Sequence, residues 1–140
     1  MKNQEKMIFH SVEVPIFSRS VFFVGNCDDK EASDAIYQFD DKRTRIYFSA
    51  TSLGGVRDAE GDVYVWVRDL SKASIVAHEL GHAACSIMEC CGINLCRETE
   101  ELMCYLIEWL KISVQDPVYQ EYEKLIAKEG SFCPDVQGLK

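Results

Sequence analysis

The sequence has no apolar run long enough to cross a membrane, and it is poor in basic residues. A transmembrane helix needs about 20 predominantly apolar residues in a row, and no segment of the 140-residue chain approaches that length. The chain has 15 Lys and Arg residues against 23 Asp and Glu residues, so its net charge is -8. Because phosphate contacts require Lys and Arg, this balance disfavours nucleic acid and an anionic membrane surface as partners.

We expect neither a secretory signal nor a disulfide framework from this sequence. The first residues, MKNQEKM, are polar, and the next segment, IFHSVEVPIF, is interrupted by His10, Glu13 and Pro15 instead of forming an apolar signal core. The seven cysteines are odd in number and include no CxxC pair, and adjacent Cys90 and Cys91 have poor spacing for a structural zinc site. We therefore expect a cytoplasmic protein with reduced thiols, most of them buried as small hydrophobic side chains.

The first half of the chain is dominated by strand patterns. The chain as a whole shows no internal repeat or low-complexity linker, so its length predicts a single domain, residues 1–140. Segments 6–17, 19–25, 44–50 and 62–69 are rich in Val, Ile and Phe or alternate in polarity, which predicts strands. Residues 27–39 predict a helix that begins with a capping box of Asp28 and Glu31. Residues 52–62, rich in glycine and charge, predict a loop.

The second half is helical. Residues 71–91 predict a helix with Ser71 as N-cap and Gly92 as its stop. Residues 98–115 predict a second helix, which Asp116 and Pro117 break before a third helix that Gly130 closes. Residues 1–70 are thus mainly strands with one helix, 71–130 are helices and 131–140 are a tail. This order predicts an α+β fold with a small mixed or antiparallel sheet packed on helices.

Two of the three histidines lie four residues apart in the stretch HELGH, residues 78–82. On a helix of 3.6 residues per turn, His78 and His82 leave the same face and can share a cation. Glu79 lies about 100° further around the helix, where it can reach a water on that cation. Two imidazoles beside a carboxylate suit Zn²⁺ and the deprotonation of water. The HExxH motif therefore predicts His78 and His82 as zinc ligands and Glu79 as general base.

The alternative is an ordinary helix that carries two half-buried histidines, because a motif with three fixed positions is often a chance match. Residues flanking the motif are apolar, which predicts a mostly buried helix whose histidines need partners. A third ligand would favour metal. The next helix opens with Glu98, Glu100 and Glu101, and a turn at Gly92 lets it run antiparallel to the first. HExxH, a turn and a glutamate-bearing helix are the layout of a gluzincin.

Residues 62–112 resemble the small zinc metallopeptidases encoded by bacteriophages and prophages. The shared features are a valine-rich strand, VYVWV, an AHELGH helix, a turn of glycine and a hydrophobic residue, and the helix start ELMCYL. More distantly, the chain is similar to compact regulatory zinc proteases of mobile elements that cleave repressors. The resemblance implies a minimal zincin-like domain, a peptide or protein substrate, and Glu101 as the third zinc ligand.

The choice of third ligand stays open. On a helical wheel Glu100 lies nearer the apolar face of its helix, whereas Glu101 groups with Glu108 on the polar side, so Glu100 is the alternative ligand. Acidic residues at a helix start are also favoured by the helix dipole alone. Tyr105, one turn after Glu101, can act as a catalytic group by orienting a ligand or donating to an oxyanion, or it can pack in the core.

Two aromatic residues of the valine-rich strand also have two interpretations. In zincins the strand beside the active-site helix pairs with extended substrate. Tyr64 and Trp66 can therefore line a peptide groove, or they can be covered by the first helix.

Three functions remain compatible with the sequence. The first is a zinc-dependent peptidase. The second is a catalytically silent zincin-fold protein of a phage or mobile element that acts by binding or regulation, which the cysteines near the motif mildly favour. The third is a helical protein without metal. The sequence predicts neither the cleavage specificity nor the oligomeric state.

Overall fold

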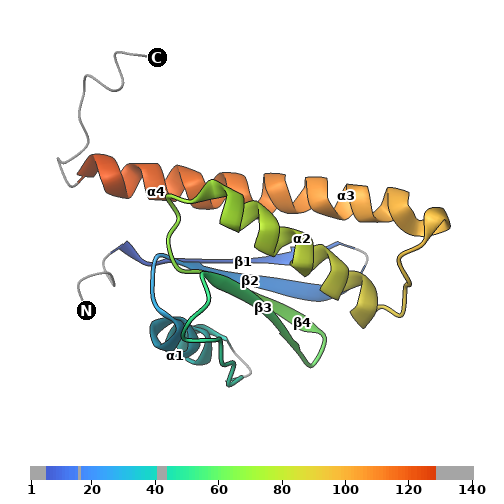
Figure 1. Cartoon of the computed structure of the whole chain (residues 1–140), viewed down its shortest axis with the longest axis horizontal. Helices are drawn as coiled ribbons and strands as arrows, with labels where there is room; N and C mark the ends of the chain where they lie inside the picture. The colour runs from blue at the N-terminus through green and yellow to red at the C-terminus, as the bar shows by residue number, and fades with distance from the viewer. Residues whose placement is uncertain (1–5, 16, 41–43, 129–140) are drawn as a thin grey trace, which may run out of the picture.

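The computed structural model describes residues 6–15, 17–40 and 44–128, which fold around a four-stranded sheet (Figure 1). The strands are β1 (Ile8–Val14), β2 (Arg19–Gly25), β3 (Gly54–Ala59) and β4 (Asp62–Val67), and their order in the sheet is β1-β2-β4-β3. The two central strands, β2 and β4, are parallel, and each edge strand is antiparallel to its neighbour. The prediction of an α+β fold with a mixed sheet is confirmed.

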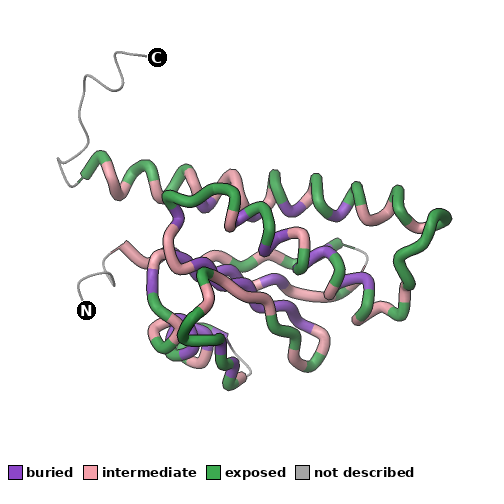
Figure 2. Tube along the Cα trace, in the orientation of Figure 1, coloured by how far each residue is buried: buried purple, intermediate pink, exposed green. Residues whose placement is uncertain are grey.

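Helices cover both faces of this sheet (Figure 1). Helix α1 (Asp29–Phe39) packs on one face, and α2 (Ala73–Cys90), α3 (Glu100–Leu110) and α4 (Asp116–Lys128) pack on the other. A 3-10 turn, η2 (Arg97–Thr99), precedes α3, and a π-helical turn, η3 (Lys111–Gln115), joins α3 to α4. Figure 2 shows the buried positions concentrated in the sheet and on the inner sides of the helices. None of the helices in the described ranges has the length and apolarity that a membrane span requires.

Strand β4 contributes to two separate hydrophobic cores, because successive side chains point to opposite faces of a sheet. Its valines pack with α2, α3 and α4, whereas Tyr64 and Trp66 pack with α1. Both aromatic side chains are fully buried. Trp66 Nε1 donates to the carbonyl of Cys27 at 2.9 Å, and the Tyr64 hydroxyl donates to Asp40 Oδ2 at 2.8 Å. Of the two interpretations of these aromatics, the structure supports cover by α1 and not a peptide groove.

The prediction of a loop at 52–62 is wrong, because this segment forms β3 and a tight hairpin with β4. Glu60 and Gly61, at the tip, have φ values of 53° and 89°. Positive φ at both central residues is what a type I′ hairpin turn requires. As an edge strand, β3 carries exposed charges and begins with two glycines, so its composition resembles that of a loop.

The strand prediction for 44–50 is also wrong, since this segment has no strand pairing. The alternation that suggested a strand still describes part of its packing. Ile46 and Phe48 are buried in the core beside α1, whereas Ala50 is exposed. An irregular segment can bury alternate side chains without the ladder of hydrogen bonds that defines a strand.

Two predicted helix ends are confirmed. Asp28 and Glu31 form the capping box at the start of α1, with backbone-to-side-chain bonds of 2.7 and 2.9 Å. Gly92, with φ of 74°, follows the end of α2, and the amide of Ile93 donates to the carbonyl of Met88 at 2.9 Å. This 6→1 bond is typical of a Schellman motif, in which glycine adopts the left-handed conformation at low cost.

The prediction of Ser71 as N-cap of α2 is wrong. The helix begins two residues later, with Lys72 at the N-cap and no side-chain cap. The amide and hydroxyl of Ser71 instead donate to Asp69 Oδ1 at 3.0 and 2.7 Å. The serine therefore stabilises the turn before the helix and not the helix itself.

A separate α-helix, α4, does begin at Asp116 as predicted, with Pro117 in its first turn, but the π-helical turn η3 joins it to α3 without an interruption of the chain's helical path (Figure 1). A proline has no amide hydrogen, so in an α-helix the carbonyl of the residue four positions earlier loses its donor. Ser113 lies four positions before Pro117, within the π-helical turn η3, and its carbonyl lies 2.9 Å from Nε2 of His10 in β1. His10, which the sequence assigned no role, thus satisfies this carbonyl and ties β1 to the helix. Gly130 and the tail lie outside the described residues.

We expect His10→Phe to lower the free energy of unfolding by about 0.5–1.5 kcal/mol, because it keeps an aromatic ring but removes the donor for this carbonyl. Pro117→Ala restores an amide hydrogen near the same carbonyl, so His10→Phe should cost less in that background. Urea denaturation of the two single variants and the double variant measures the coupling. Equal costs of His10→Phe in both backgrounds would show that the carbonyl does not depend on His10.

Candidate metal centre

The two histidines of the motif are in contact with each other on the surface of α2. The Nε2 atoms of His78 and His82 lie 3.1 Å apart, and the rings meet edge to face with centroids 4.7 Å apart. Both residues are exposed, so the expectation that they lie in a mostly buried stretch is wrong. The buried side of α2 is formed by Val76, Leu80 and other apolar residues on the opposite side of the helix. The predicted convergence of the two imidazoles is nevertheless present.

Glu79 is buried although its two histidine neighbours are not. Its side chain is 8% exposed, and no hydrogen bond or ion pair within the described residues involves it. Among the described residues, only Arg19 Nε and Ser33 Oγ are polar side-chain atoms that are completely enclosed and have no hydrogen-bond partner. The Glu79 oxygens are not among them, so they retain some access to solvent. A carboxylate that is buried without a partner is costly. The Glu79 carboxylate avoids this cost because it faces a hollow beside the helix.

This hollow lies between α2 and the edge strand β3, and its volume is about 510 Å³. From β3 it is lined by residues 54–57, and from α2 by Glu79, His82, Cys85, Ser86 and Glu89. The hollow therefore brings together the unpartnered carboxylate and one of the two imidazoles. The sequence did not predict that β3 forms its other wall, because this segment resembled a loop.

The predicted third ligands are not grouped with the histidines. Glu100 and Glu101 are exposed in the first turn of α3, which begins beyond the C-terminal end of α2 (Figure 1). His82 is eight residues before the end of α2, about 12 Å at 1.5 Å per residue. Within the ranges that the structure describes, no three His, Cys, Asp or Glu side chains are grouped so that they could hold a metal ion. The assignment of Glu101, or of Glu100, remains a prediction.

Tyr105 lies on the same helix as these glutamates and is 61% exposed. It is thus not a core residue, and the alternative of a packed, satisfied tyrosine is wrong. Its hydroxyl has no hydrogen bond within the described residues. Its catalytic role stays a prediction.

The cysteines differ from the sequence-based expectation. Of the six in the described residues, all of which are free, Cys27 is buried, whereas Cys85, Cys96 and Cys104 are exposed. Burial raises the pKa of the Cys27 thiol to about 12, and the pKa of Cys90 is also raised by burial. The expectation that most cysteines are buried is therefore wrong for this part of the chain. Cys133 lies outside it.

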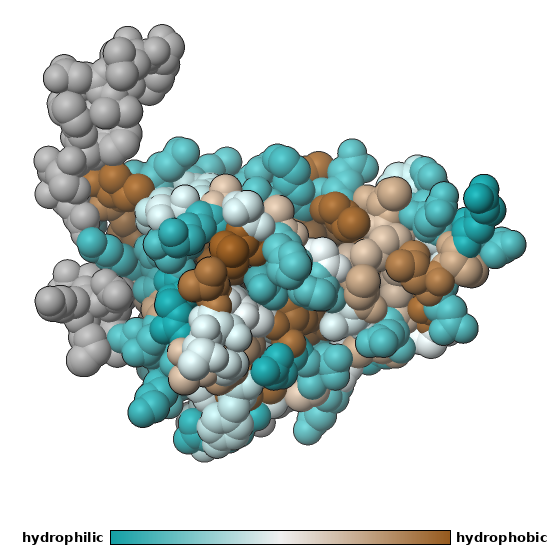
Figure 3. Space-filling view, viewed as in Figure 1, coloured by the Kyte–Doolittle hydropathy of each residue, from teal (hydrophilic) through white to brown (hydrophobic). Residues whose placement is uncertain are grey.

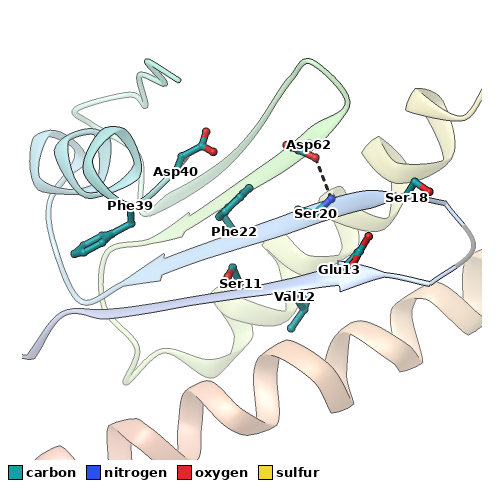
Figure 4. A pocket seen from close by; sticks show the side chains of 9 residues that line it. All are labelled: Ser11, Val12, Glu13, Ser18, Ser20, Phe22, Phe39, Asp40 and Asp62. Atoms are coloured by element: carbon teal, nitrogen blue, oxygen red, sulfur yellow. Dashed lines mark hydrogen bonds between the residues drawn. The ribbon is translucent and has the colours of Figure 1, made fainter. Parts of the chain in front are cut away.

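A second hollow, of about 480 Å³, lies on the α1 face of the sheet (Figure 4). Two buried carboxylates line it, but both have partners. Asp62 Oδ1 accepts from the amide of Ser20 at 3.0 Å, and Asp40 accepts from Tyr64. These carboxylates connect elements of the fold, and the α2 hollow is the one in which a buried carboxylate has no protein partner within the described residues.

On the face shown in Figure 3, hydrophobic residues lie among hydrophilic ones. Comparisons of the chain with protein-family models, with curated proteins and with solved structures return no match.

Proposed function

We propose that this protein is a zinc-dependent metallopeptidase that hydrolyses peptide bonds. The observation that carries the proposal is the carboxylate of Glu79, buried without a partner beside a hollow that His82 also lines. The resemblance of residues 62–112 to phage and prophage metallopeptidases, with their minimal zincin-like fold, points to the same function.

The two imidazoles fit a zinc ion. A zinc–nitrogen bond is about 2.0–2.1 Å long, and the two Nε2 atoms are 3.1 Å apart, less than the length of two such bonds. One ion can therefore touch both nitrogens. Exposure of both rings leaves room for a third protein ligand and for water or substrate, which a hydrolytic zinc site requires.

Glu79 suits the role of general base. Zinc supplies Lewis acidity, because it lowers the pKa of water towards about 7 and polarises a carbonyl. Glu79 takes up the water proton on its carboxylate and delivers it to the nitrogen of the leaving amine. Since the carboxylate has no protein partner in the described residues, it is free to make both contacts.

The hollow suits an extended polypeptide. Strand β3 is an edge of the sheet, and strands at an edge can pair with an added peptide strand through main-chain hydrogen bonds. A peptide that pairs with β3 would run past residues 54–57 and bring a carbonyl into the hollow lined by Glu79 and His82. The substrate class that follows is a polypeptide in extended conformation.

Hydrolysis of a mixed peptide library, followed by mass spectrometry, tests the proposal. We expect cleavage that stops when a chelator removes the metal and returns when zinc is added. A protein that retains zinc but cleaves no peptide would instead favour the alternative, a catalytically silent zincin-fold protein that acts by binding. Cleavage that a chelator leaves unchanged would contradict the proposal.

A further inference from the structure

Gly54 lies directly against the side chain of Glu79. A Cβ atom added to Gly54, the first residue of β3, would lie 3.0 Å from Glu79 Cγ and 3.3 Å from its Cδ. The same atom would lie 2.8 Å from the carbonyl oxygen of Trp66 in β4. Because that oxygen belongs to the backbone of a central strand, a side chain at position 54 has no room on that side.

Strand β3 cannot easily move away to make room. The amide of Arg68 donates to the carbonyl of Leu53 at 2.9 Å. The Arg68 guanidinium donates to the carbonyl of Ser52 at 3.1 Å and to that of Ala50 at 2.9 Å. Arg68, the residue that follows β4, thus holds the segment that leads into β3 through its amide and its guanidinium. Gly54 is held against β4 by these bonds and by its pairing with Val67.

We propose that Gly54 is a positioning residue for Glu79. Because Gly54 has no Cβ, the Glu79 side chain has room to point its carboxylate into the hollow that His82 also lines. A methyl group at position 54 would displace the carboxylate, because the backbone of Trp66 and the bonds to Arg68 resist movement of the strand. The inference rests on the proposed function for its catalytic consequence, but the positioning itself does not depend on catalysis.

Two other glycines provide matched controls. Gly55 is the next residue of β3, and a Cβ there would meet Phe48 Cδ1 at 3.2 Å on the opposite face of the strand. Gly81 lies inside the HELGH motif, but a Cβ there would have no neighbour within 4 Å. Gly55→Ala therefore adds a methyl group to the same strand, and Gly81→Ala adds one to the same motif, without contact with Glu79.

The first readout does not require activity. In protein labelled with ¹³C at glutamate carboxyl groups, Glu79→Gln identifies the Glu79 resonance by its disappearance. We expect Gly54→Ala to shift this resonance and Gly55→Ala and Gly81→Ala to leave it in place. The same small displacement in all three variants, or none in Gly54→Ala, would overturn the inference whether or not the protein is an enzyme.

The second readout is kinetic. A misplacement of about 1 Å in a catalytic group can lower the rate about 100-fold. We expect Gly54→Ala to lower kcat by up to this factor with unchanged KM and unchanged zinc content, and Gly81→Ala to leave all three unchanged. Loss of zinc from Gly54→Ala would overturn the inference, because the change would then affect the metal site and not the base. If wild-type protein cleaves nothing while the carboxyl resonance still shifts, the proposed function fails and the positioning stands.

A third variant covers the case in which Gly54→Ala does not fold. Glu79→Ala removes the Cγ and Cδ atoms that the added methyl group would meet. We expect Gly54→Ala to destabilise the Glu79→Ala background less than it destabilises wild type, because the contact with Glu79 is then absent while the contact with the Trp66 carbonyl remains. Equal destabilisation by Gly54→Ala in both backgrounds, measured by urea denaturation, would assign the conflict to Trp66 alone and overturn the inference.

Discussion

Replacing Glu79 with glutamine is expected to abolish peptide hydrolysis and to leave the zinc content unchanged. Glutamine has nearly the same shape but cannot accept the proton from water at neutral pH. Loss of a general base lowers rates by about 10²- to 10⁴-fold. Because Glu79 lies beside the histidines and is not a predicted ligand, metal binding should not depend on it. Initial rates on a cleaved peptide and elemental analysis of the same sample measure the two quantities.

Glu123→Gln is the matched control for this variant. It removes the same charge from an exposed position on α4, so neither hydrolysis nor zinc content should change. If Glu79→Gln loses its zinc, Glu79 is a ligand and its assignment as general base is wrong. If hydrolysis persists at the rate of wild-type protein, another group accepts the proton.

Replacing Trp66 with alanine is expected to destabilise the fold by about 3–5 kcal/mol, because truncation of a fully buried tryptophan leaves a cavity. Trp66 has no exposed surface, packs with Phe48 and donates to the carbonyl of Cys27, which loses its partner in the variant. Since domains are typically stable by about 5–15 kcal/mol, this loss would unfold much of the protein on mild heating. Urea denaturation gives the change in the free energy of unfolding.

Tyr47→Ala is the control for this prediction, because Tyr47 is a large aromatic residue of the same region but 69% exposed. Truncation of an exposed side chain usually changes stability by no more than about 0.5 kcal/mol. Equal effects of the two truncations would contradict the assignment of Trp66 to the core beneath α1.

The sequence predicted the elements whose physical signal is local. Alternation of valines and aromatics defines β4, a capping box starts α1, and Gly92 ends α2. The i, i+4 spacing predicted the contact between His78 and His82, because helical geometry alone brings them together. Burial of Glu79 was not predicted, since it depends on how α2 packs against an edge strand that the sequence did not reveal.

The errors arise where long-range contacts decide the structure. The chain stays helical on both sides of Pro117, which lies in the first turn of α4, and the nearby Ser113 carbonyl contacts His10, more than a hundred residues earlier, a contact that no local pattern indicates. Strand β3 is formed by pairing with β4, although its own composition predicts a loop. The choice of third zinc ligand also depends on a long-range contact, because the position of Glu101 or Glu100 is set by how α3 lies relative to α2.

The most direct test of the account is the zinc content of protein purified without a histidine tag, measured by elemental analysis of wild type and of His78→Ala and His82→Ala. The account predicts about one zinc ion per wild-type chain and loss of zinc in either variant, because both imidazoles hold the ion. Parallel measurements on Glu101→Ala and Glu100→Ala would identify the third ligand as the one whose removal also lowers the zinc content. A wild-type ratio near zero, in protein that also takes up no zinc when it is added, would contradict the account.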